Sequence, residues 1–129
     1  MAPSDGARIL VVEDDPAVRE LLRLSLASNG YQVSLAEHGL DALMQIDRAK
    51  PKPQLLLVDI MIPELDGLSL VRALKSRPET RGIPVVFITA KSDSRTIAEG
   101  ISAGARYYIT KPFLIDDLLA KVKRAIEAG

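Results

Sequence analysis

Five short apolar runs recur at regular intervals along the chain and restrict its fold more than any other feature. Three of the runs are nearly continuous in Val, Ile, Leu and Phe, a pattern typical of strands buried on both faces of a parallel sheet. The predicted strands are 8–12 (RILVV), 31–36 (YQVSLA), 54–59 (QLLLVD), 84–89 (PVVFIT) and 106–110 (RYYIT).

The segments between these runs have helical spacing. Asp15 followed by Pro16 is a strong start for a helix, because Asp caps the first turn and Pro suits the first helical position. The predicted helices run from Pro16 to about Asn29, Gly39–Arg48, Asp66 to just before Pro78, Ser94–Ala103 and Ile115–Ile126. The fourth helix has only two strong apolar anchors, Ile97 and Ile101. A strand–helix unit repeated five times predicts one doubly wound α/β domain over 8–129, with 1–7 as an N-terminal tail.

Composition excludes several functional classes. The 129 residues include 17 basic and 17 acidic ones, so no net field favours direct binding of nucleic acid or an anionic membrane. Cysteine is absent, which removes disulfides and thiolate chemistry. The N-terminus lacks the features of a signal peptide, and no apolar run approaches the ~20 residues of a membrane span, so we expect a cytoplasmic protein. The five units fill the chain, and any output domain would lie outside it.

Polar residues follow every predicted strand. Ligands of open α/β sheets bind at the carboxyl ends of the strands, so these positions are the candidate site. They are Glu13-Asp14-Asp15, Glu37-His38-Gly39, Asp59, Thr89-Ala90 and Lys111-Pro112. We expect His38, the only histidine, to be neither a phosphodonor nor a metal ligand.

Glu13, Asp14 and Asp59 would converge if the first and third strands are neighbours. Clustered carboxylates repel one another unless a cation lies among them, and an oxygen-only set suits Mg²⁺, or Mn²⁺ in its place. The alternative for Glu13 and Asp14 is a solvated acidic turn, and Asp15 is best interpreted as a helix cap.

Asp59 lies inside an otherwise apolar run, LLLVDIMIP. A carboxylate beside a metal can act as a nucleophile toward a phosphoryl group. Lys111 would then neutralise one phosphoryl oxygen and Thr89 would donate to another. Taken singly, Lys111 could be an ordinary surface lysine and Thr89 an ordinary strand residue. Their joint placement at strand ends favours a site.

The sequence resembles the receiver domain of two-component response regulators, over about Arg8 to Ile126. The motifs ILVVEDDPAVRELL, LLLVDIMIPELDGLSLV, PVVFITA and AGARYYITKPF carry the resemblance. It implies a flavodoxin-like fold with sheet order 2-1-3-4-5 and a phosphorylation-dependent switch. A histidine kinase or a histidine phosphotransfer protein would donate the phosphoryl group, and a downstream protein target or an output domain would respond.

By this resemblance Asp59 is the phosphoacceptor and a metal ligand. Asp14 is the direct metal ligand of the acidic pair, and Glu13 acts through water. The main-chain carbonyl of Met61 is the third protein ligand, and we expect Met61 with Ile62 and Pro63 to cover the site.

The resemblance also assigns the switch. Thr89 and Lys111 match the switch hydroxyl and the phosphate-binding lysine, Lys111-Pro112 matches a cis bond, and Tyr108 matches the aromatic residue that swings inward. The face of the fourth helix, fifth strand and fifth helix would then change. Phosphorylation-dependent homodimers occur in the family, although Arg106-Tyr107 replace the acids of one common ion-paired dimer. No enzymatic activity is expected beyond the domain's own phosphoryl transfer and slow self-dephosphorylation.

Three other functions are possible for a related fold or for a related aspartyl site. A flavin-binding electron carrier needs a phosphate-binding loop after the first strand, where this chain has acids. A phosphohydrolase with an aspartyl nucleophile would carry another Asp at position 61, which is Met. A pseudo-receiver that no longer accepts phosphate remains the main alternative, and the full set of site residues argues against it.

Overall fold

Five strands and five helices alternate along the chain, as predicted. The computed structural model describes residues 6–62, 64–91 and 93–128. The elements are β1 (Arg8–Val12), α1 (Pro16–Ala27), β2 (Gln32–Ala36), α2 (Gly39–Arg48), β3 (Leu55–Val58), α3 (Gly67–Lys75), β4 (Val85–Thr89), α4 (Ser94–Ala103), β5 (Tyr107–Thr110) and α5 (Ile115–Ala128). Each predicted strand agrees with the observed one to within one residue. Part of the proposed N-terminal tail, Ala7, packs in the core.

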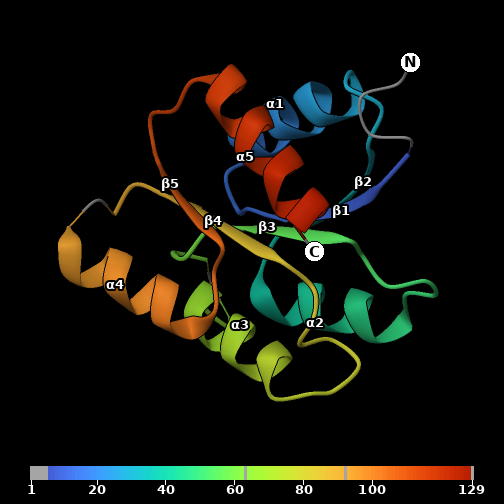
Figure 1. Ribbon diagram of the computed structural model, residues 1–129, viewed down its shortest axis with the longest axis vertical. Helices are drawn as coiled ribbons and strands as arrows, with labels where there is room; N and C mark the ends of the chain where they lie inside the picture. The colour runs from blue at the N-terminus through green and yellow to red at the C-terminus, as the bar shows by residue number, and fades with distance from the viewer. Residues whose placement is uncertain (1–5, 63, 92, 129) are drawn as a thin grey trace.

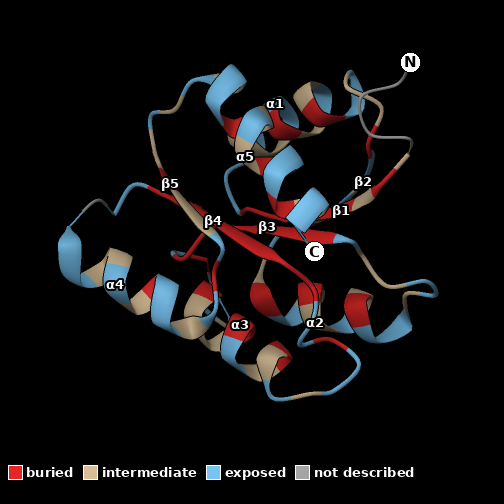
Figure 2. Ribbon diagram, viewed as in Figure 1, coloured by how far each residue is buried: buried red, intermediate tan, exposed pale blue. Residues whose placement is uncertain are grey.

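All strand pairs are parallel, and the sheet order is β2-β1-β3-β4-β5. This confirms the predicted doubly wound fold. Helices α1 and α5 cover one face of the sheet, and α2, α3 and α4 cover the other (Figure 1). The central strands β3 and β4 are buried throughout, whereas β2 and β5 form the edges (Figure 2). Because all strand pairs are parallel, the carboxyl ends of all five strands lie on the same side of the molecule.

Side-chain caps begin four of the five helices. Asp15, Asp66 and Asp93 accept hydrogen bonds from backbone N–H groups in the first turns of α1, α3 and α4. His38 does the same for α2, since its Nδ1 accepts from the N–H of Asp41 at 3.1 Å. The cap gives this single histidine a structural role that its place in a polar turn did not reveal.

Backbone hydrogen bonds continue past the strands and hold the loops that carry the polar residues. Glu13 N–H donates to the Ala36 carbonyl at 3.0 Å, and Asp59 N–H donates to the Val12 carbonyl at 2.9 Å. Gly67 lies so close to this turn that a Cβ there would be 2.6 Å from the Asp59 carbonyl oxygen. The start of α3 thus packs directly on the end of β3.

No helix in the described part of the chain has the length and apolarity needed to cross a membrane.

Candidate functional site

Asp59 is a buried carboxylate at the end of β3, with only 4% of its surface exposed. Its Oδ1 accepts from the N–H of Met61 at 2.9 Å, and its Oδ2 accepts from Lys111 Nζ at 2.8 Å. A buried charge is tolerated when it is paired and hydrogen-bonded, and both conditions are met here. The apolar strand therefore holds Asp59 in one place while Lys111 balances its charge.

Lys111 joins Asp59 to Glu13. Its ammonium lies 2.8 Å from Glu13 Oε1 as well as 2.8 Å from Asp59 Oδ2. Glu13 is fully buried, and its Oε2 accepts from the N–H of Asp15 at 3.1 Å. The peptide bond between Lys111 and Pro112 is cis, as the resemblance implied. Lys111 was predicted to lie at the site, but its bridge to Glu13 was not.

Burial and ion pairing shift the pKa values of Glu13 and Lys111 in opposite directions. Burial raises the pKa of Glu13 above its ordinary value, and hydrogen bonds from Lys111 and Asp15 offset part of that increase. Burial alone would lower the pKa of Lys111, but hydrogen bonds to Asp59 and Glu13 outweigh it and raise the pKa overall. Lys111 is therefore held in its charged form, as a cation that must neutralise carboxylates should be.

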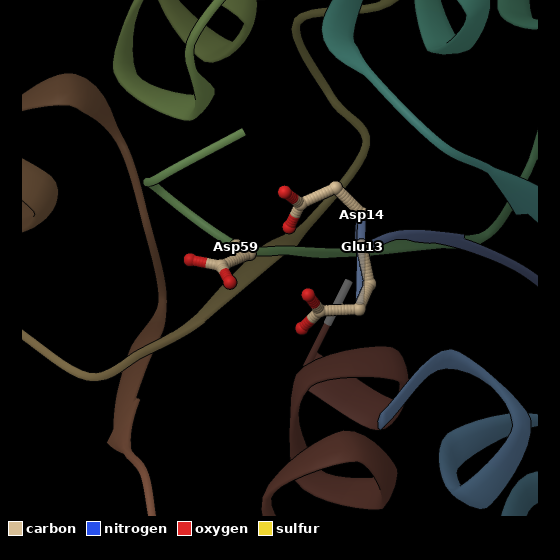
Figure 3. Close-up of side chains that lie close together, drawn as sticks. All are labelled: Glu13, Asp14 and Asp59. Carbon is tan, nitrogen blue, oxygen red and sulfur yellow. The ribbon is translucent and has the colours of Figure 1, made fainter. Parts of the chain in front are cut away.

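Carboxylate oxygens of Glu13, Asp14 and Asp59 lie within 4.8 Å of one another. Glu13 and Asp14 project to opposite sides of the end of β1, and Asp59 comes from the neighbouring strand (Figure 3). Asp14 is exposed, while Glu13 and Asp59 are buried. An all-oxygen cluster that is partly open to water suits Mg²⁺, which usually retains several water ligands. The predicted convergence of the three acids is confirmed, and the cluster could hold a metal.

The loop after Asp59 differs in part from the expectation that it covers the site. Met61 is 56% exposed, and Ile62 is buried in the core on the α2 and α3 side. Pro63 lies outside the described residues. Met61 contributes its N–H to Asp59, and the role of its carbonyl stays a prediction.

Arg19 supports the acidic loop, although no sequence motif indicated this role. Its Nη1 donates to the carbonyl of Glu13 at 2.9 Å and to that of Asp14 at 3.4 Å, and its Nη2 lies 3.4 Å from Glu37 Oε1. The guanidinium thus fixes the backbone on which both acids sit. A single arginine in the first turns of α1 gave no signal, because helix surfaces often carry arginine.

Thr89 and Tyr108 are linked through the backbone of Lys91. Thr89 is fully buried at the end of β4, and its Oγ1 is 3.4 Å from the N–H of Lys91. The Tyr108 hydroxyl donates to the Lys91 carbonyl at 2.7 Å, and its ring lies 6.4 Å from that of Phe87. The two predicted switch residues therefore contact the same peptide segment, which neither motif indicated.

The model of the response regulator receiver domain family matches residues 9–123. The chain belongs to this family. Receiver domains of two-component response regulators are phosphorylation-dependent signalling domains rather than classical enzymes, and the acidic cluster described above is consistent with that chemistry.

Curated relatives show the same relationship. The chain is 45% identical over 118 residues to response regulator MprA of Mycobacterium bovis, and 44% identical over 118 residues to that of Mycobacterium tuberculosis. These alignments cover 92% of this chain and 50% of each relative. The receiver domain thus spans about half the length of the curated relatives it matches.

Solved structures are similar over nearly the whole chain. A putative response regulator from Chloroflexus aurantiacus is 35% identical with a TM-score of 0.89, covering 95% of this chain and 98% of that one. The signal receiver domain of a histidine kinase from Syntrophus aciditrophicus is 36% identical with a TM-score of 0.88, covering 95% and 92%. The receiver domain of sensor histidine kinase PA1611 from Pseudomonas aeruginosa, with magnesium coordinated in its active site cleft, is 30% identical with a TM-score of 0.86, covering 95% and 98%.

Proposed function

We propose that Asp59 accepts a phosphoryl group from a histidine kinase or a histidine phosphotransfer protein, and that this controls partner binding at the face formed by α4, β5 and α5. The main support for this proposal is the position of Asp59, which is buried and held by hydrogen bonds from the Met61 N–H and Lys111. Its carboxylate lies close to oxygens of Glu13 and Asp14. A nucleophilic carboxylate needs this fixed position and these neutralising charges more than it needs a strong base.

In the proposed transfer, an Asp59 oxygen forms a bond to phosphorus while the bond from phosphorus to the donor nitrogen breaks. Lys111 turns from Asp59 toward a phosphoryl oxygen, and the Thr89 hydroxyl donates to another. Asp14 and Asp59 would ligate Mg²⁺ or Mn²⁺ directly, with the Met61 carbonyl, and Glu13 through water. The metal would neutralise the charge that builds on the phosphoryl oxygens.

The proposed switch starts when Thr89 moves toward the phosphoryl group. Its Oγ1 would then leave the N–H of Lys91, and the Lys91 peptide that also accepts from Tyr108 could shift. Gly100 is the only buried residue of α4, so this helix can change position at little cost. Movements of Thr89, Tyr108 and α4 would together shift the face formed by α4, β5 and α5 between two conformations. Kinases, targets or a second receiver domain could distinguish these conformations.

Intact-mass spectrometry after incubation with acetyl phosphate and Mg²⁺ tests the proposal. We expect the native chain to gain one phosphoryl group and Asp59→Asn to gain none. Asp66→Asn is the matched control, because Asp66 caps α3 outside the cluster and Asn retains a capping oxygen. If the native chain gains no phosphoryl mass, or if Asp59→Asn gains as much as the control, the pseudo-receiver alternative is favoured.

A further inference from the structure

A cavity lies at the amino-terminal ends of β1 and β2, whereas Asp59 lies at the carboxyl end of the sheet. The cavity has a volume of about 440 Å³ and lies between the first residues of β1 and β2, the last turn of α2 and the connection to β3. Arg8 and Leu10 of β1 pair in register with Gln32 and Ser34 of β2, and strand alternation directs all four side chains to the α2 face. The volume is within the range of about 300–1,000 Å³ common for small-molecule pockets.

The polar lining of this cavity is cationic. Among the residues that the structure describes, it includes Arg8 and Arg48 and no acidic residue. Among the described residues, neither arginine is ion-paired to a carboxylate. Arg8 Nη2 donates to the Lys52 carbonyl at 3.3 Å, whereas its buried Nε has no partner in the part of the chain that the structure describes. A buried donor without an acceptor costs free energy, so turning the Arg8 guanidinium toward an acceptor that enters the cavity is favoured.

The rest of the lining is neutral and partly apolar. Ala49, Pro51 and Pro53 contribute carbon surface, and Gln45 already donates to the Leu35 carbonyl at 2.7 Å. A ligand that matches this cavity therefore needs an anionic group for the two guanidinium groups and a compact apolar body that packs against the prolines.

We propose that this cavity binds a small organic carboxylate with a compact apolar body, at a site separate from the phosphoacceptor. The carboxylate lies between Arg8 and Arg48, and the apolar part contacts Pro51 and Pro53. Binding needs neither phosphorylation nor metal, because none of the cavity's residues belongs to the acidic cluster.

Titration of the full chain with benzoate, followed by amide NMR shifts, tests this site. We expect saturable shifts at Gln32, Ser34 and Ala49. Benzamide, which has the same shape without the charge, and inorganic phosphate, which has charge without the apolar body, should both bind at least about tenfold more weakly. Absence of saturable shifts overturns the proposal.

Two variants localise the effect. Arg48→Gln changes an exposed helix residue and should weaken benzoate binding about tenfold, the usual scale for losing a charge-assisted hydrogen bond. Arg8→Lys keeps the charge but removes the fork, and should also weaken binding. Arg95→Gln, at a side chain 90% exposed on α4, is the control and should leave the affinity unchanged. Native affinity in both Arg48→Gln and Arg8→Lys, or equal binding of benzamide, contradicts the proposal.

Discussion

Lys111 is the residue on which the electrostatics of the site depend. Its ammonium is 2.8 Å from a carboxylate oxygen of both Glu13 and Asp59, and these two acids are almost completely buried. The same cation opposes metal binding, because it reduces the negative charge that attracts Mg²⁺. Lys111 should thus stabilise the metal-free protein and weaken its attraction for the proposed Mg²⁺.

Replacing Lys111 by Met should therefore have two opposite effects. Without Mg²⁺, we expect the free energy of unfolding in urea to fall by roughly 1–3 kcal/mol, since two buried carboxylates lose a partner. Calorimetric titration should show tighter Mg²⁺ binding than in the native chain. Lys121→Met is the control: its partner Asp117 is half exposed, so a change below about 1 kcal/mol is expected. Weaker Mg²⁺ binding in Lys111→Met would refute this account.

Met61 and Lys91 bear on how long a phosphoryl group would remain on Asp59. Met61 follows the acceptor by two residues and Lys91 follows Thr89 by two, so both should flank the path of an attacking water. Neither side chain is a carboxylate or an amide that could position that water, so we predict slow self-dephosphorylation. The decay of the phosphorylated mass after removal of acetyl phosphate measures the rate. A half-life of only seconds would contradict the prediction.

At the scale of elements, α4 and β5 meet through a close contact. A Cβ at Gly100 would lie 3.1 Å from the ring of Phe87 and 3.2 Å from that of Tyr108. Phe87 is fully buried and cannot move aside, whereas Tyr108 is only half buried. The missing side chain at Gly100 therefore lets the Tyr108 ring lie against α4 while its hydroxyl reaches Lys91.

Gly100→Ala should displace Tyr108 rather than Phe87. We expect the Tyr108 ring signals and the Lys91 amide to shift in NMR spectra as the hydroxyl leaves the Lys91 carbonyl. Stability should fall only modestly, by about 1 kcal/mol, because the better helix propensity of Ala offsets part of the crowding. In Gly82→Ala the added carbon meets no atom within 4 Å, and these signals should not change. Unaltered Tyr108 signals in Gly100→Ala would count against the contact's role.

At the scale of the whole molecule, the proposed switch should act on one side only. Beryllofluoride with Mg²⁺ stands in for the phosphoryl group, and we expect it to shift amides near Asp59 and across α4, β5 and α5. Amides in the first residues of β1 and β2 lie at the far edge of the sheet and should change little. Spectra that stay unchanged on the α4 and β5 side would exclude the proposed switch.

Much of this architecture could be predicted because local patterns encode it. Apolar runs and caps set the strands and helices, and parallel strands necessarily bring Glu13, Asp14 and Asp59 to one edge. Burial at the site could not be predicted in the same way. Glu13 and Asp14 are adjacent acids, yet Glu13 is fully buried against Lys111, whereas Asp14 lies exposed in the bend that follows β1. The contacts of Arg19 and Lys91 likewise depend on segments that only the folded chain brings together.

The bridge between Lys111 and Glu13 joins residues that are 98 positions apart. Nearly the whole chain must be folded before this ion pair exists, and the same Lys111 ammonium balances the charge of Asp59. The proposed acceptance of a phosphoryl group by Asp59 should therefore require a nearly complete fold. A truncated or misfolded copy should then accept no phosphoryl group. It should not divert phosphoryl groups from correctly folded copies.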